Sequence, residues 1–358
     1  MRRSSFTRRQ ALTAYGSLLG GSALLRAQQP QAPQLIGEPP GRIPPPSELV
    51  NAFEFGLMAQ RKLDRATYAE VADSDRAPID RITFNPRMMV NTTTLDLSAT
   101  LFGDNLFAPM LIGPIAEQKR FHPDGELAMA RGASAAKTAM VVADHSSFPV
   151  DQIAKEAKVP LWYQVYPGGD LPAARTRVAR AVKAGCKVVV ITAGIPYRAA
   201  GAGPTAPALL DWRVIDQLRQ GITVPVVLKG VMTAEEAQAA VSRGFQGIVV
   251  SNYGGRSFPA TASGILALPG IADTVAGKAS ILVDGGLRRG SDVLKALALG
   301  AQGVLLARPA AWSLAAYGSD GVQNMLQVIQ NELARDMMMC GLVNIKSITR
   351  AAVAVHRR

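Results

Sequence analysis

The sequence predicts an α/β fold: eight parallel strands, each followed by a helix, forming a (β/α)8 TIM barrel with an N-terminal helical extension. Short apolar runs rich in β-branched residues recur at intervals of roughly 20–40 residues. Stretches with helical spacing, rich in Ala, Leu and charged residues, separate these runs. The length of 358 residues accommodates a barrel of about 250 residues as a single domain.

Residues 1–27 have the pattern of an export signal. Arginines at the start are followed by an apolar, Gly-rich stretch, residues 11–25, and by Ala27, a small residue suited to cleavage. Residues 7–12, Thr-Arg-Arg-Gln-Ala-Leu, are similar to the twin-arginine export pattern. An ordinary secretory signal or a retained anchor stays open as an alternative, although the apolar stretch is short for a membrane span. We therefore expect an exported protein, periplasmic or otherwise extracytoplasmic.

Much of the positive charge belongs to this first segment. Residues 1–27 contain five arginines and no acidic residue, so the rest of the chain carries a formal net charge of +7, five less than the +12 of the whole chain. Basic clusters with interleaved aromatic residues are missing from the sequence, so we do not expect a nucleic acid partner. Anionic substrates or an anionic membrane surface remain compatible with the charge. Of the two cysteines, Cys186 lies at an expected helix-to-strand junction, where a buried thiol is favoured.

Residues 28–48 are rich in Pro and Gln, which is typical of a flexible or polyproline II tether. Helical periodicity begins near Ser47 and continues through Leu49 and Met58. The expected organisation is a signal at 1–27, a linker at 28–48 and one barrel domain at 49–358.

The eight apolar runs are the expected barrel strands. The strands of a parallel barrel are buried on both faces and therefore read as nearly continuous apolar segments. The runs lie at residues 107–114, 139–144, 160–166, 187–194, 225–231, 247–255, 280–286 and 303–309. We expect helices between them, for example at 170–184 and 233–243, and a long last helix at about 311–339 on the outside of the barrel.

Residues 282–309 are the most informative segment of the chain. They are typical of a strand, a Gly-Gly turn with two arginines, a helix and a second strand. In barrels of this kind the loops after the last two strands often bind phosphate through backbone N–H groups and cations. A purely structural turn is the alternative. The candidate phosphate-binding residues are Asp284, Gly285, Gly286, Arg288, Ala307 and Arg308.

Polar side chains stand at the carboxyl ends of most of the expected strands, which is where catalytic groups lie in such barrels. So many polar side chains at the ends of apolar strands indicate a functional site, although Thr192 and Ser251 are individually compatible with satisfied core hydroxyls. These residues are Asp144, His145, Gln164, Tyr166, Thr192, Lys229, Ser251, Asp284 and Arg308.

These motifs resemble those of the FMN-dependent α-hydroxy-acid dehydrogenases and oxidases, the family of glycolate oxidase and L-lactate dehydrogenase, from about Leu57 to Ala352. The resemblance implies FMN as the cofactor, and it implies Lys229 beside the N1 and O2 edge of the flavin. A fixed cation there stabilises the negative charge of a reduced flavin. It further implies flavin contacts for Pro114, Ile115, Ala116, Gln164, Thr192 and Ser251.

The substrate half of the site is only partly retained. The resemblance implies that Tyr166 contacts the substrate and that Arg256 holds its carboxylate through a planar fork of donors. In the family a histidine accepts the hydroxyl proton while hydride passes to the flavin. Here the motif reads Ser-Asn-Tyr-Gly-Gly-Arg, with Tyr253 in place of that histidine. A phenol with a pKa of about 10 is a poor base near neutral pH.

Three further departures affect the same half. The aspartate that partners the histidine falls at Gly194, and the N-terminal active-site tyrosine falls at Phe55. The long loop after the fourth strand, which supplies a second carboxylate-binding arginine, is reduced to residues 196–211, and Arg198 is the arginine within it. The sequence therefore predicts an altered substrate site beside a retained flavin site.

Of the three histidines, His145 lies at a position suited to chemistry, directly after Asp144 at the end of the second strand. We hypothesise that Asp144 and His145 supply a relocated base or a substrate contact. A polar loop histidine without chemistry is the alternative. The candidate catalytic residues are Tyr253, Tyr166, Arg256 and His145.

The resemblance implies an FMN-dependent oxidoreductase that oxidises a 2-hydroxy acid, or a related alcohol or amine, by hydride transfer to flavin, and the pattern of residues 1–27 adds the expectation that it is exported. We expect a small, anionic substrate, and the sequence leaves oxygen, a quinone and a redox protein open as the electron acceptor. A homo-oligomer is a further expectation. The alternatives are a flavin enzyme without net redox chemistry, similar to the flavin-dependent isopentenyl diphosphate isomerases, and a non-catalytic flavin-binding protein.

Overall fold

The computed structural model describes residues 42–73, 76–167, 170–193, 211–253 and 263–356. The chain divides into two units, Met1–Pro44 and Pro45–Arg358, and the second holds the whole fold described below. The expected export signal and most of the expected linker lie outside the described residues. At the end of that linker, Pro46–Glu48 forms a short 3-10 helix, η1. Within the described ranges, no helix has the length and apolar character needed to span a membrane.

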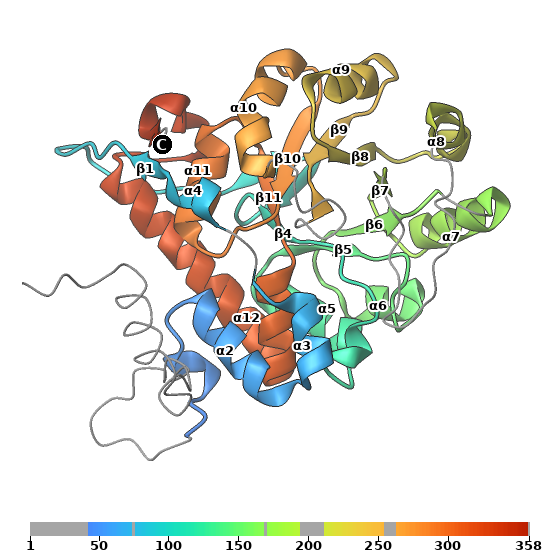
Figure 1. The fold of residues 1–358 in the computed structure, drawn as a ribbon, viewed down its shortest axis with the longest axis horizontal. Helices are drawn as coiled ribbons and strands as arrows, with labels where there is room; N and C mark the ends of the chain where they lie inside the picture. Colours follow the sequence, from blue (N-terminus) through green and yellow to red (C-terminus); the bar gives the residue numbers. More distant parts are fainter. Residues whose placement is uncertain (1–41, 74–75, 168–169, 194–210, 254–262, 357–358) are drawn as a thin grey trace, which may run out of the picture. The chain divides into compact units, whose positions relative to one another are not determined.

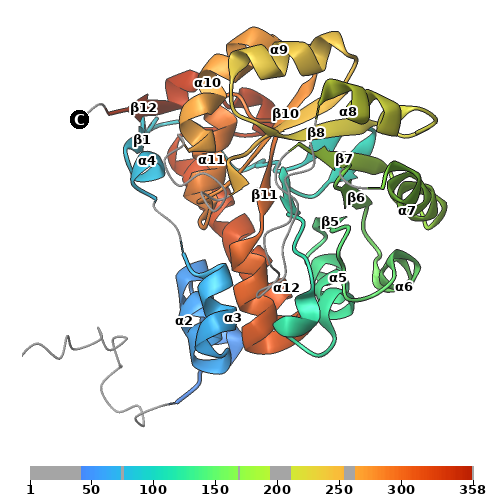
Figure 2. The ribbon, with the colours of Figure 1, turned by 45° about the vertical axis from the view of Figure 1, so that its right-hand side comes forward.

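The predicted (β/α)8 barrel is confirmed. Eight parallel strands form a closed sheet in the order β10-β11-β4-β5-β6-β7-β8-β9 (Figures 1 and 2). Each of the eight apolar runs contains one of them. The strands are β4 (Met110–Ile112), β5 (Ala139–Val142), β6 (Leu161–Val165), β7 (Val188–Thr192), β8 (Val226–Val231), β9 (Gly247–Val250), β10 (Ser280–Asp284) and β11 (Gly303–Leu306).

Helices cover the outside of the barrel, as Figure 2 shows for α7, α9 and α10. The two helices predicted at 170–184 and 233–243 are present as α7 and α9. A capping box explains where α9 starts, because Thr233 and Glu236 each accept from a backbone N–H of the other. The helices between strands are α5 (Gly125–Ala135), α6 (Val150–Glu156), α7 (Leu171–Lys183), α8 (Trp212–Arg219), α9 (Ala234–Ser242), α10 (Gly264–Val275) and α11 (Gly290–Ala298).

The last helix, α12 (Arg308–Met339), begins three residues before the predicted start and is interrupted. Tyr317 and Gly318 have non-helical backbone angles, and Gly318 has a φ of 60° that favours glycine. The N-terminal extension, α2 (Ala52–Lys62), α3 (Arg65–Val71) and α4 (Ala77–Asp80), is helical as predicted, and α2 packs along α12 (Figure 1). A short antiparallel pair of strands, β1 (Ile82–Phe84) and β12 (Val353–Val355), joins the extension to the end of the chain.

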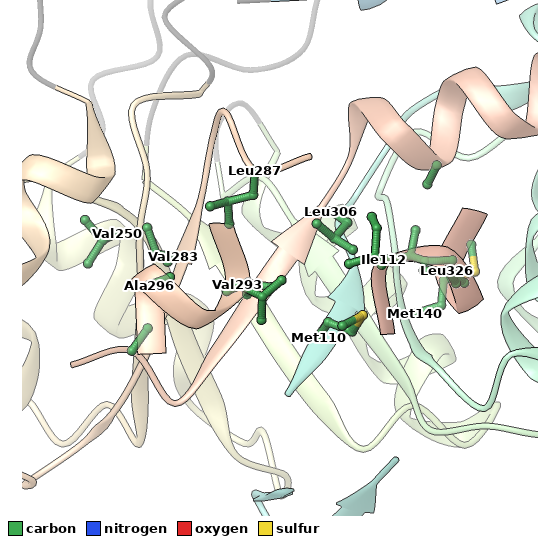
Figure 3. Close-up of a cluster of buried hydrophobic side chains, with 14 of the residues drawn as sticks. Met110, Ile112, Met140, Val250, Val283, Leu287, Val293, Ala296, Leu306 and Leu326 are labelled. Atoms are coloured by element: carbon green, nitrogen blue, oxygen red, sulfur yellow. The ribbon is translucent and has the colours of Figure 1, made fainter. Parts of the chain in front are cut away.

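The core has two layers. One lies between strands and helices, where Met110, Ile112, Leu306 and Leu326 meet (Figure 3). The other fills the barrel interior and includes Trp162, whose ring lies edge-on to Phe102 at 5.3 Å. Phe102 belongs to the hairpin of β2 (Ala99–Leu101) and β3 (Asp104–Leu106), which packs against this interior cluster.

Both cysteines are free and buried, which confirms the buried thiol predicted at Cys186. Burial raises the pKa of the Cys186 thiol to about 12, so the group stays protonated and unreactive near neutral pH. This thiol therefore has a packing role.

Candidate active site

The barrel brings the predicted polar residues to one edge of the sheet. Thr192 pairs in register with Lys229 across β7 and β8, and Val283 pairs with Val250 across β10 and β9. Asp284 and Ser251 each come directly after those two valines, at the carboxyl ends of their strands. The parallel direction of the strands places all these ends together, as the sequence predicts.

Lys229 is the centre of a buried polar cluster. Its ammonium nitrogen lies 2.8 Å from Oδ2 of Asp284 and donates to Oγ of Ser251, also at 2.8 Å. Lys229 is 5% exposed and Ser251 is fully buried. A cation this well removed from water requires such partners, because burying an unpaired charge is costly. Oδ1 of Asp284 is also buried, and no residue in the described part of the chain donates to it.

Tyr253 lies over this cluster, with its ring 5.0 Å from the Lys229 ammonium. Its side chain is directed toward Gly230, where the lack of a side chain leaves room: a Cβ at that position would lie 1.9 Å from the phenolic oxygen. Gly230 has a φ of 110°, a conformation in which glycine is strongly favoured. The Tyr253 hydroxyl is buried, and it has no hydrogen-bond partner among the residues placed by the structure.

The protonation state of Tyr253 follows from this position. Burial raises the pKa of the phenol well above its ordinary value, and the nearby Tyr166 and Asp284 raise it further. The group therefore stays neutral near pH 7. A neutral phenol can donate a hydrogen bond, but it is a weak proton acceptor.

Gln164 and Thr192, the residues expected at the flavin ring, contact each other. Nε2 of Gln164 donates to Oγ1 of Thr192 at 2.9 Å, and both residues are 2% exposed. Oε1 of Gln164 accepts from the backbone N–H of Asp144 at 3.4 Å. The orientation of the Gln164 amide is therefore set from both of its ends.

The structure gives Asp144 partners that the sequence analysis did not predict. Its carboxylate accepts from Nε and Nη2 of Arg177, at 2.6 and 3.2 Å, and from the Tyr163 hydroxyl at 2.9 Å. It also accepts from the backbone N–H of Tyr166 at 3.3 Å. The Asp144 carboxylate, which the hypothesis pairs with His145, is therefore already bound by three other groups.

His145 is exposed at the rim of the same edge, and its ring stacks on Tyr166 with the centroids 6.0 Å apart. The two residues expected to meet a substrate are therefore neighbours. The loop after β4 carries the half-buried Pro114, Ile115 and Ala116 at this end of the barrel.

The N-terminal extension contacts the segment expected to bind the phosphate, the Gly285–Gly286 turn and Arg288. Gly285 and Gly286 have positive φ angles of 96° and 77°, as a tight Gly-Gly turn requires. The Arg288 guanidinium is buried, donates to Asp73 at 2.9 and 3.1 Å, and lies over the Trp312 ring. Burial is the main cause that lowers the pKa of Arg288.

Arg308 and Ala307 stand at the start of α12, beside the end of β11. The N-terminus of a helix attracts anions, so this position suits a phosphate group. Arg256, Arg198 and Gly194 lie outside the described residues. Phe55 is fully buried in α2, where it packs edge-on against Tyr317 at 6.2 Å.

The sequence analysis missed two side chains that bind Asp144 at this edge, Tyr163 and Arg177. Tyr163 is one of several large apolar residues in its strand, and Arg177 is one of several arginines in α7. No local pattern separates Arg177 from its neighbours on the helix, because its partner lies 33 residues earlier in the chain.

Comparison with known proteins gives consistent results. The family model described as FMN-dependent dehydrogenase matches residues 58–202 and 200–355. Glycolate oxidase 1 of Oryza sativa subsp. indica is 32% identical, over 86% of this chain and 96% of that protein. Glycolate oxidase 3 of Arabidopsis thaliana is 33% identical over the same shares.

Solved structures agree with the sequence relatives. A crystal structure of mandelate oxidase has a TM-score of 0.79 and 32% identity, covering 86% of this chain and 98% of its own. Mandelate oxidase with 3,3-difluoro-2-hydroxy-3-phenylpropionic acid reaches a TM-score of 0.82 at 33% identity, covering 86% of this chain and all of its own. The likeness therefore extends over the whole barrel.

Proposed function

Because the chain belongs to the FMN-dependent dehydrogenase family, with FMN as its cofactor, we propose that it is an exported oxidoreductase with an altered substrate site. Its substrate is a small anionic 2-hydroxy acid, or a related alcohol or amine. The observation that carries the proposal of an altered flavin enzyme is the cluster of Lys229, Asp284 and Ser251, combined with a neutral Tyr253 where the family has its base. Export is proposed from the pattern of residues 1–27 alone.

The residues at the carboxyl edge fit FMN. The buried Lys229 ammonium offers a fixed cation, and Gln164 and Thr192 offer amide and hydroxyl groups for a polar ring edge. The positive-φ turn at Gly285 and Gly286 and the start of α12 at Arg308 suit a phosphate. When bound, FMN supplies the two-electron acceptor for the hydride that leaves the substrate carbon.

The chain's own residues then bind and orient the substrate. The cation of Lys229, held by Asp284, favours negative charge beside it. The half-buried Tyr166 offers a phenol at the rim, and Arg256 is the residue proposed to hold the substrate carboxylate through two parallel hydrogen bonds.

Proton removal from the substrate needs a group other than Tyr253. His145, beside Tyr166, carries an imidazole, the side-chain group that serves most often as a general base in enzymes. We assign it the role of relocated base or substrate contact in this chain. Replacement by alanine is expected to slow flavin reduction; an unchanged rate with a confirmed substrate contradicts the assignment.

The experiment that tests the proposal is an absorbance spectrum of the purified mature protein, repeated without oxygen after adding a panel of 2-hydroxy acids, alcohols and amines. Bleaching of the flavin band by one compound supports an oxidoreductase and identifies the substrate class. Bound flavin that no compound bleaches favours the non-redox or non-catalytic alternative. Failure to bind FMN at all contradicts the proposal.

Export and the electron acceptor are tested separately. Replacing Arg8 and Arg9 with lysines leaves the charge unchanged but removes the twin-arginine pattern, so we expect the protein to remain inside the cell. Export that continues in this variant, yet stops when the apolar stretch is disrupted, favours an ordinary secretory signal. Reoxidation of the reduced flavin by oxygen, a quinone or a redox protein distinguishes the three acceptors.

A further inference from the structure

An ion pair between the buried side chain of Asp144 and the partly exposed Arg177 links the outer helix α7 to the residues expected at the flavin. Asp144, just after β5, has a side chain that is 1% exposed, and Arg177 of α7 binds it with two hydrogen bonds. Helix α7 packs against β6, the strand that carries Gln164 (Figure 2). The ion pair therefore connects the outer layer of the barrel to its carboxyl edge.

The remaining hydrogen bonds of Asp144 to described residues lead to the end of β6. Its carboxylate accepts from the Tyr163 hydroxyl and from the Tyr166 backbone N–H, at 2.9 and 3.3 Å. Its own backbone N–H donates to Oε1 of Gln164. Asp144 therefore forms hydrogen bonds with three residues at the end of β6. Its side chain binds Tyr163 and Tyr166, and its main chain binds Gln164.

The consequence is a fixed orientation for Gln164. With Oε1 turned toward Asp144, Nε2 donates to Thr192 at 2.9 Å. Amide groups rotate easily unless both ends are bonded, so the position of Asp144 decides which edge of the Gln164 amide faces the cofactor. The hydrogen bond from the Tyr166 backbone N–H to the Asp144 carboxylate fixes the main chain of Tyr166, the residue on whose ring His145 stacks.

Electrostatics keep Asp144 and its side-chain partners in one arrangement. The hydrogen bond to Asp144 is the main cause that raises the pKa of Arg177, so the guanidinium remains charged. Burial, together with the Asp144 carboxylate, raises the pKa of Tyr163, so its phenol remains a donor. Two charge-assisted bonds from a planar guanidinium also resist rotation more than a single contact does.

We propose that Asp144 and Arg177 are positioning residues, which preset Gln164 and Tyr166 for FMN and substrate from outside the site. Neither needs to touch the flavin. The proposal does not depend on the identity of the substrate, because it concerns the FMN-binding residues of the family to which the chain belongs.

The test uses the FMN-loaded full-length protein and three variants: Asp144→Asn, Arg177→Gln and Arg177→Lys. Arg180→Gln is the matched control, since Arg180 lies one turn further along α7 and forms an ion pair with Asp151 in which both side chains are exposed. FMN release on serial dilution, followed by flavin fluorescence at 25 °C, gives the dissociation constant. The flavin absorbance envelope and the thermal midpoint are recorded in parallel.

We expect Asp144→Asn and Arg177→Gln to raise the dissociation constant for FMN about tenfold, equivalent to about 1.4 kcal/mol, and to change the absorbance envelope. Arg177→Lys keeps the charge and one bond, so it recovers part of the affinity. Arg180→Gln keeps the parental values. If Arg177→Gln does not fold, the dissociation constants and absorbance envelopes of Arg177→Lys and Asp144→Asn are compared with those of the parent instead.

A purely structural ion pair gives a different result. In that case the variants lower the thermal midpoint, but at 25 °C they retain the parental dissociation constant and flavin spectrum. An effect of Arg180→Gln as large as that of Arg177→Gln also overturns the proposal, because it assigns the change to the charge of α7 as a whole.

Discussion

Replacement of Tyr253 by phenylalanine removes one oxygen atom from the centre of the site. That oxygen is buried and has no hydrogen-bond partner in the described part of the protein. A buried polar group without a partner costs about 1–3 kcal/mol, so we expect Tyr253→Phe to raise the free energy of unfolding by about 1 kcal/mol. Tyr163→Phe is the matched control with the opposite sign, because its hydroxyl donates to the Asp144 carboxylate.

The same variant tests whether Tyr253 is the base. A phenol with an ordinary pKa of about 10 is ionised to about 0.1% at pH 7, and burial of Tyr253 lowers this fraction further. Loss of a working general base slows a reaction by about 10²–10⁴-fold, whereas we expect Tyr253→Phe to reduce flavin at a rate within about tenfold of the parent.

Two assays measure these effects. Urea unfolding of the flavin-free protein compares the parent, Tyr253→Phe and Tyr163→Phe, and anaerobic stopped-flow bleaching follows the flavin between pH 6 and pH 9. Destabilisation by Tyr253→Phe would refute the assigned environment of its hydroxyl. A loss of about 10²-fold or more in rate, together with loss of a rising alkaline limb, would refute the assignment of a neutral phenol.

Three other predictions concern stability and charge. Because burial raises the pKa of Tyr253, the folded protein keeps a phenolic proton that the unfolded chain loses above about pH 10. The contribution of Tyr253 to stability is therefore complete below that pH and falls above it by up to about 1.4 kcal/mol per pH unit. Urea unfolding at pH 9 and 11 measures this slope, which we expect to be smaller in Tyr253→Phe. Lys229→Met leaves the Asp284 carboxylate, which is only 14% exposed, without its cation and lowers the free energy of unfolding by about 3–5 kcal/mol. The double variant with Asp284→Asn recovers much of this loss. Calorimetry compares the two variants, and equal thermal midpoints contradict the pairing. Gly132→Ala places a Cβ 2.5 Å from the backbone oxygen at position 319, so we expect it to destabilise the folded protein by about 1–3 kcal/mol. In Gly270→Ala, within α10, the new Cβ has no atom within 4 Å, so we expect it to stabilise the folded protein by about 0.5–1 kcal/mol. Denaturant unfolding measures both changes, and the same sign for both variants contradicts the packing argument.

Much of the fold and of the flavin half could be predicted from the sequence. Strand periodicity located all eight barrel strands, since a buried parallel strand is apolar throughout and its pattern is local. Lys229, Ser251 and Asp284 follow from those strands, because the carboxyl ends of parallel neighbours lie at one edge. The early start of α12 and its interruption at Gly318 were not predicted, because packing decides where a long apolar helix begins and bends.

What each side chain contacts within that edge depended on the tertiary structure. The sequence shows a tyrosine at 253, but only the fold directs its hydroxyl toward Gly230 and away from water. The sequence also places Asp144 next to His145, whereas the fold pairs its carboxylate with Arg177. Residue type and strand position are local properties of the chain. Protonation and hydrogen-bond partners depend on groups that are distant in sequence and adjacent only after the barrel closes.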